Sequence, residues 1–157
     1  MRQTICVAFV LFSLCLLNGC NKRKPVTVHP VSGQVLYAGA PAAGVRVFLL
    51  PTSAPMMPDI PANPHGVTGA DGRFTLTTFT EGDGAAEGGY QVILFWPEEK
   101  KPDERDESDS DRLLGWYSGV HSRETAQITA GPNTLAVIDI PHIAEPPAAV
   151  NGVPGRN

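Results

Sequence analysis

The sequence predicts an all-β fold, an antiparallel β-sandwich of six or seven short strands. Its apolar runs are short and rich in Val, Ile, Thr and aromatic residues, which favour strands. Turn residues separate the runs, since the 157 residues include 16 glycines and 15 prolines. No window repeats apolar residues every three to four positions over the length of a helix. Short strands without long helices are typical of a sandwich.

The first 19 residues have the parts of a secretory signal peptide. A short, positively charged start precedes the almost wholly apolar residues 5–17, and the small residue Gly19 stands directly before Cys20. The apolar run is too short to span a bilayer, which takes about 20 residues. We therefore predict that residues 1–19 are removed on export, together with the other two cysteines of the chain.

Cys20 is the expected lipid attachment site. The stretch LNGC, which ends at Cys20, resembles the bacterial lipobox, in which the cysteine after the cut is lipidated. Acylation removes a thiol that is prone to pairing between molecules, and several acyl chains anchor a protein firmly. The resemblance implies an exported lipoprotein of the bacterial cell envelope, held at the inner or the outer membrane. Ordinary secretion with a stray cysteine is the alternative.

The two ends of the mature chain differ from its middle. Residues 20–30 form the expected tether, and its basic residues 22–24 either touch anionic head groups or are simply solvated. Residues 142–157 are rich in Pro, Gly and small side chains, which predicts a flexible tail. The folded part then spans residues 31–141, the usual size of one domain.

Six runs in the folded part have the pattern of strands. Alternate residues are apolar in the first three, which predicts one buried face, and the fourth is apolar on both faces, as in a central strand. The runs cover residues 31–37, 45–50, 73–79, 90–96, 125–130 and 134–140.

Turn residues connect these runs. The pair Asp71 and Gly72 is a strong hairpin signal, so Asp71 is assigned to a turn rather than to a calcium loop, which needs several oxygen ligands. Residues 131–133 are expected to link the last two strands in the same way. Gly39 and Gly44 bracket a tight connection in which we expect positive φ angles.

Three stretches resemble a known family, the carboxypeptidase-regulatory-like domain. They are SGQVLYAGAPAAGVRVFL at 32–49, GVTGADGRFTLTT at 66–78 and GGYQVILFW at 88–96. The resemblance implies a seven-stranded antiparallel transthyretin-like (prealbumin-like) sandwich over residues 31–141, such as small bacterial lipoproteins carry. The matching positions are Ser32, Gly33, Val35, Gly39, Pro41, Gly44, Val45, Val47, Asp71, Gly72, Phe74, Leu76, Gly89 and Tyr90.

No catalytic or metal-ligating pattern occurs in the sequence. The four histidines are expected in separate loops, without the spacing of zinc ligands. The motifs G-x-S-x-G and H-E-x-x-H do not occur, and the chain ends in GVPGRN instead of the Tyr-Arg-Gly-Ser-like tail of transthyretin-like hydrolases. We therefore predict no enzyme, no cofactor and no metal. The net charge of -4 also gives no support to nucleic-acid binding.

Two adjacent stretches of the chain depart from the strand pattern. Residues 97–112 carry eight acids against four bases, which indicates a solvated connector, with weak attraction of divalent cations as the alternative. Residues 113–117 are apolar again. They either fold back to cover a sheet edge, which we favour, or present Trp116 and Tyr117 as possible ligand contacts to a sugar or a protein partner.

These features predict a non-enzymatic, membrane-anchored envelope lipoprotein whose β-sandwich is a structural or binding module. The first alternative is a lipoprotein that binds carbohydrate or peptide through Trp116 and Tyr117 or through a sheet edge. The second is a hydrolase of unrecognised type. An exposed aromatic shelf favours the first alternative, whereas converging His, Asp and Ser side chains in a pocket favour the second.

Replacing Cys20 by Ala should release the protein from membranes or leave the uncut precursor, because the acyl chains supply the anchor. Fractionation of the native host with detergent, followed by intact mass measurement, checks this expectation. An unmodified residue 20 in the membrane-bound protein would contradict the anchor.

Overall fold

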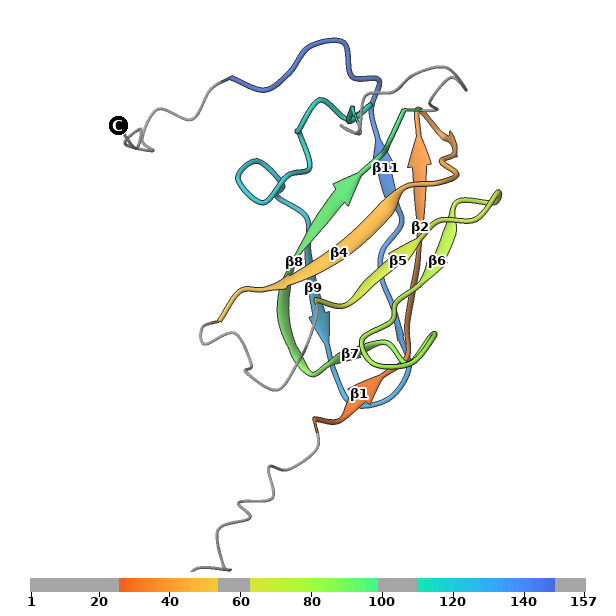
Figure 1. Ribbon diagram of the computed structural model, residues 1–157, viewed down its shortest axis with the longest axis vertical. Coiled ribbons are helices and arrows are strands. Elements are labelled where there is room, and N and C mark those ends of the chain that lie inside the picture. Colours follow the sequence, from red (N-terminus) through yellow and green to blue (C-terminus); the bar gives the residue numbers. More distant parts are fainter. Residues whose placement is uncertain (1–25, 54–62, 99–109, 149–157) are drawn as a thin grey trace, which may run out of the picture.

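A computed structural model describes residues 26–53, 63–98 and 110–148, and it is all-β in these ranges (Figure 1). Cys20 and most of the acidic stretch at 97–112 lie outside the described residues. Within the described ranges, no helix occurs that is long and apolar enough to span a membrane. The expected all-β class is confirmed, and the strands form two main sheets and a small two-stranded one.

The first main sheet is built around the long strand β2, Val31–Tyr37. On one edge, β2 pairs antiparallel with β3 (Ala40–Pro41) and β6 (Arg73–Thr75). On the other edge, it pairs with β10 (Asn133–Thr134) and β11 (Ile138–Ile140).

The second main sheet has the order β5-β4-β8-β9 and is antiparallel throughout. Its longest strand lies in the interior of the sheet, as the apolar residues on both of its faces predict. The strands are β5 (His65–Val67), β4 (Arg46–Pro51), β8 (Gly88–Phe95) and β9 (Thr125–Ile128).

Both main sheets contribute to one hydrophobic core. Val31 and Val35 of β2 are buried together with Val47 and Leu49 of β4, and alternate residues of β8 join them. The expected alternation of buried and outward side chains is therefore confirmed in these strands. Burial of each such side chain contributes about 1.5–3 kcal/mol of hydrophobic stabilisation.

The last two strands differ from the expected antiparallel arrangement. β10 and β11 both pair parallel with β2. The expected hairpin at residues 131–133 is wrong, because β9 pairs with β8 whereas β10 pairs with β2. The turn is therefore a crossover between the two sheets, and it returns the chain in the direction of β2 (Figure 1). The Asn133 amide stabilises this crossover by donating to the carbonyls of Thr129 and Gly131 at 3.0 and 2.7 Å.

The turn at Asp71 and Gly72 is confirmed, but it joins strands of different sheets. Gly72 has the positive φ of 74°, and Asp71 Oδ1 accepts the Arg73 N–H at 3.0 Å. Beyond the turn, β5 and β6 are held side by side by two backbone hydrogen bonds between His65 and Thr77, 2.8 and 3.0 Å long. These bonds join the two sheets along one side of the fold.

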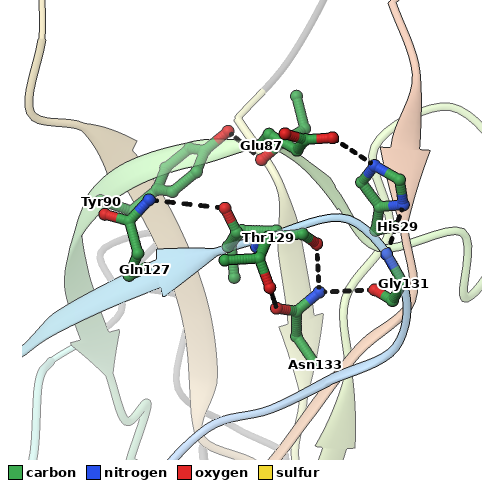
Figure 2. Close-up of polar contacts among 9 residues, drawn as sticks. His29, Glu87, Tyr90, Gln127, Thr129, Gly131 and Asn133 are labelled. Carbon is green, nitrogen blue, oxygen red and sulfur yellow. Dashed lines mark hydrogen bonds and ion pairs between the residues drawn. The ribbon is translucent and has the colours of Figure 1, made fainter.

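His29 joins the start of the chain to the sandwich (Figure 2). It lies in β1 (Val28–His29), inside the expected tether, and β1 pairs with β7 (Ala85–Ala86). His29 Nδ1 accepts the Gly131 N–H at 3.1 Å, and Nε2 lies 3.1 Å from Glu87 Oε1. His65 lies in β5, so the expectation that all four histidines occupy loops is wrong for these two.

Residues 110–124 cover the half of the β8 edge that β9 does not reach. β9 pairs with β8 only from Gly88 to Gln91. Beyond that point, Val92 N donates to Glu124 O at 2.9 Å and Leu94 N donates to Tyr117 O at 3.1 Å. This arrangement satisfies backbone groups that would be costly to bury unpaired. The expected cover of a sheet edge therefore exists, and it is made by main-chain atoms.

Asp111 and Arg112 have structural roles, although both were expected in a solvated connector. Asp111 Oδ1 accepts the N–H groups of Trp96 and Leu113, each at 3.0 Å. The Arg112 guanidinium lies 3.5 Å from the centroid of the Trp96 ring, in the position of a cation–π contact. These contacts fix the start of the covering segment against the end of β8.

Replacing Leu113 by Ala should lower the free energy of unfolding by about 2–5 kcal/mol, because Leu113 is fully buried in the core. Its neighbour Leu114 is 40% exposed and serves as the matched control, so Leu114→Ala should cost less than about 1 kcal/mol. Urea unfolding of both variants measures the difference. Equal costs would contradict the role of Leu113 in fixing the segment.

Asp83 makes the stability of the fold dependent on pH. Its carboxylate accepts the N–H groups of Thr78, Phe79 and Thr80 at 2.7, 3.0 and 2.8 Å. Burial raises the pKa of Asp83, but these hydrogen bonds outweigh it and hold the pKa below the usual value. The stabilisation is therefore complete above the unfolded pKa of about 3.9 and is lost as pH falls through the folded value.

We expect the free energy of unfolding to fall less steeply below about pH 4 in Asp83→Asn than in the parent protein, because the variant lacks this linkage. Urea unfolding in steps from pH 5 down to pH 2.5 measures the slopes. The neighbouring exposed Glu81 gives the control variant Glu81→Gln. An unchanged slope in Asp83→Asn would contradict the assignment.

Candidate functional site

The covering segment of residues 110–124 projects Trp116 outward. Leu114 and Gly115 both have positive φ angles, 50° and 82°, which reverse the chain after the buried Leu113. Asp111 Oδ2 accepts the Gly115 N–H at 3.0 Å and holds this turn. The Trp116 side chain that follows is 44% exposed. A large aromatic ring is therefore held half-exposed by a turn that is itself hydrogen-bonded.

Trp116 forms one wall of a pocket of about 590 Å³. Another wall comes from the chain after β11. Trp116 Nε1 donates to the Glu145 carbonyl at 2.7 Å, and this bond joins the two walls. The volume is within the range of small-molecule sites. The lining residues are Trp116, Tyr117, His121, Arg123, Glu124, Pro141, His142, Ile143, Ala144 and Glu145.

Tyr117 forms the inner part of the pocket. It is partly buried and packs against the hydrophobic core. Burial raises the pKa of the Tyr117 hydroxyl, and the negative charges of Glu124 and Asp139 raise this pKa further. The Tyr117 hydroxyl is therefore neutral at physiological pH.

Carboxylates outnumber Lys and Arg side chains around this pocket. Glu124 and Glu145 line it, and Asp139 lies close enough to affect Tyr117, whereas Arg123 is the one lysine or arginine among the lining residues. Such a balance disfavours a strongly anionic ligand, because like charges repel in a partly desolvated site. A neutral or cationic ligand with a flat or apolar face fits the lining better.

The fold brings together residues that are distant in the sequence. Trp116 and Tyr117 were both expected as possible ligand contacts, and they share this pocket. His121 and His142 also line it, although the sequence places them 21 positions apart. Sequence analysis missed one wall altogether, because residues 142–145 were assigned to the flexible tail. Ile143 in fact packs against the core, and its N–H donates to the Tyr37 hydroxyl at 3.2 Å.

Ser122 lies between lining residues in the sequence but has a structural role. Ser122 is buried, and its hydroxyl donates to the Val92 carbonyl at 2.6 Å rather than to a histidine. In the part of the chain that the structure describes, no group of three or more His, Cys, Asp or Glu side chains could hold a metal ion.

Comparisons with known proteins identify no family. No protein-family model matches the chain, and no curated protein matches it. Among solved structures, the crystal structure of a 9R-lipoxygenase from Cyanothece PCC8801 is similar, with 11% identity and a TM-score of 0.43. The similarity covers 88% of this chain and 21% of the lipoxygenase chain. A similarity this weak carries no argument about activity.

Proposed function

We propose that this protein is a non-enzymatic, lipid-anchored binding protein of the bacterial cell envelope, and that its binding site is the Trp116 pocket. The observation that carries the proposal is the half-exposed Trp116 ring, held by the Glu145 carbonyl at a pocket with both polar and apolar lining residues. An exposed aromatic ring with hydrogen-bonding groups around it is typical of sites for saccharides and peptides.

The lipid anchor rests on the LNGC stretch that ends at Cys20. The chain enters the fold through β1, at the lower end of Figure 1, whereas the segment that carries Trp116 lies in its upper half. The part of the expected tether that precedes β1 would therefore hold the pocket away from the membrane surface. Such a position favours a water-soluble ligand over a membrane lipid.

The proposed fold family is the transthyretin-like sandwich of the carboxypeptidase-regulatory-like domain. Two main sheets that enclose one core support it, as do the strands at the matched stretches of residues 32–49, 66–78 and 88–96. In this proposal the sandwich is a rigid support, and the function is carried by the segment that covers β8.

Replacing Trp116 by Ala should weaken ligand binding by at least about tenfold, since a stacked aromatic ring contributes about 1–3 kcal/mol. A glycan array and a displayed library of random peptides, both probed with the full-length mature protein, supply the ligands for this measurement. Because the side chain is 44% exposed, the same change should cost only about 1–2 kcal/mol of stability.

The matched control for this test is Leu114→Ala. Leu114 is an exposed apolar residue of the same segment, but it does not line the pocket. The Leu114→Ala variant should leave ligand binding unchanged. Ligands that bind the Trp116→Ala variant as tightly as the parent protein would place the binding site elsewhere.

A further inference from the structure

The two main sheets are joined along one side and separate along the other. The backbone bonds between His65 and Thr77 join β5 to β6. On the opposite side, the edge strands are β9 in one sheet and the β10–β11 chain in the other, and the described residues contain no backbone pairing between them. We call this open side the seam, bounded by residues 124–127 and 134–138.

The β9 edge presents unpaired peptide groups to the seam. Val92 N donates to Glu124 O, so the backbone groups that bond across the two strands face each other at this register position. Because hydrogen-bonded and non-bonded pairs alternate, the N–H and C=O groups of Thr125 and Gln127 point away from β8. Figure 2 shows Gln127 at the end of β9, just before the crossover. No other strand of the described residues pairs with this edge.

The opposite rim of the seam has the same character. Ile140 O accepts the Ala38 N–H at 2.8 Å, so the peptide groups of Ile140 face β2. In a strand, the backbone N–H and C=O groups of successive residues face opposite edges. The N–H and C=O groups of Asp139 therefore point away from β2. Two strand edges with free hydrogen-bonding groups thus border one opening.

The seam holds a cavity, and one residue of its rim also lines the Trp116 pocket. A cavity of about 210 Å³ lies between residues 124–127 and 134–138. Glu124 lines both this cavity and the Trp116 pocket, so both lie beside this residue. The sequence of β9, TAQI, contains none of the Pro or Lys residues that commonly block an edge strand.

We propose that the protein binds an extended peptide, which adds as a strand to the free edge of β9 and places a basic side chain in the Trp116 pocket. The inference rests on the proposed function, because it uses the same pocket and names the class of ligand. Strand addition is an established way for proteins to bind peptides, in which main-chain bonds supply affinity and side-chain pockets supply selectivity.

Charge complementarity favours a basic side chain at the pocket. Two carboxylates, Glu124 and Glu145, line the pocket, and the negative charge of Asp139 acts on Tyr117. Arg123 is the one Lys or Arg side chain in the lining. A guanidinium can also stack on the indole of Trp116. The chain already contains such a pair, since the Arg112 guanidinium lies 3.5 Å from the Trp96 ring.

The test compares Thr125→Pro with Thr125→Val in the full-length mature protein. Proline removes the N–H that points into the seam, while the β8 bonds on either side of residue 125 remain. Valine keeps that N–H and changes only the side chain. The probe is a displayed library of random peptides of about seven residues, enough to span β9 and reach the pocket. The strongest selected peptide is then synthesised and its Kd is measured by calorimetry.

We expect Thr125→Pro to weaken binding of the selected peptide by about tenfold or more, which is the effect of losing one or two main-chain hydrogen bonds. Thr125→Val should stay within about threefold of the parent protein. The selected peptide should contain Lys or Arg, and replacement of that residue by norleucine should weaken binding to a similar extent. N-methylation of alternate peptide bonds provides a second measurement if Thr125→Pro fails to fold.

Several outcomes would overturn strand addition. One is that the selected peptide binds the Thr125→Pro variant as tightly as it binds the parent protein. Another is that the N-methylated peptide binds the parent protein as tightly as the unmodified peptide does. If Trp116→Ala still weakens binding in that case, the proposed function stands and only the strand addition fails; if neither change matters, both fail. Sedimentation of the protein alone tests whether a second copy occupies the edge. A dimer that Thr125→Pro disrupts and that the peptide does not displace would also overturn the proposal.

Discussion

β8 extends beyond its neighbour β9, and the need to satisfy its exposed edge determines much of the structure. A central strand in a hydrophobic core cannot leave its N–H and C=O groups unpaired without a large cost. The segment at 110–124 supplies the missing partners through the carbonyls of Tyr117 and Glu124 and the carboxylate of Asp111. The same segment inserts Leu113 into the core, so hydrophobic burial and backbone pairing reinforce each other.

The pocket is a consequence of this covering segment. A regular strand at that edge would alternate its side chains between the core and the outer face of the sheet. The segment instead makes a series of turns, one of which needs a positive φ at Leu114 and Gly115. The Trp116 ring therefore projects sideways, toward the chain that follows β11, and its indole N–H fastens the Glu145 carbonyl. Two segments without regular structure thereby become the two walls of one site.

The two sides of the sandwich have different roles in the proposed function. The side at β5 and β6 is joined by backbone hydrogen bonds and holds the sheets together. The side at β9 and β11 has no backbone pairing between the described strands, and Glu124 on this side also lines the pocket beside Trp116. The entering strand β1 is fastened by His29 to Glu87 and Gly131, at the end of the fold away from the segment at 110–124 (Figure 1). A firmly held entry and an open seam are consistent with a tethered binding module.

The sequence by itself determined the all-β class, the main strands and the turn at Asp71, because alternation and turn chemistry act between near neighbours. It also pointed to Trp116 and Tyr117. It did not reveal the parallel pairing of β10 and β11 or the wall at 142–145, whose four residues carry no periodic pattern. Only the tertiary structure decided these features, because they depend on which edges remain unpaired after the sheets form. That outcome is set by contacts between distant residues, as when Trp116 binds the Glu145 carbonyl.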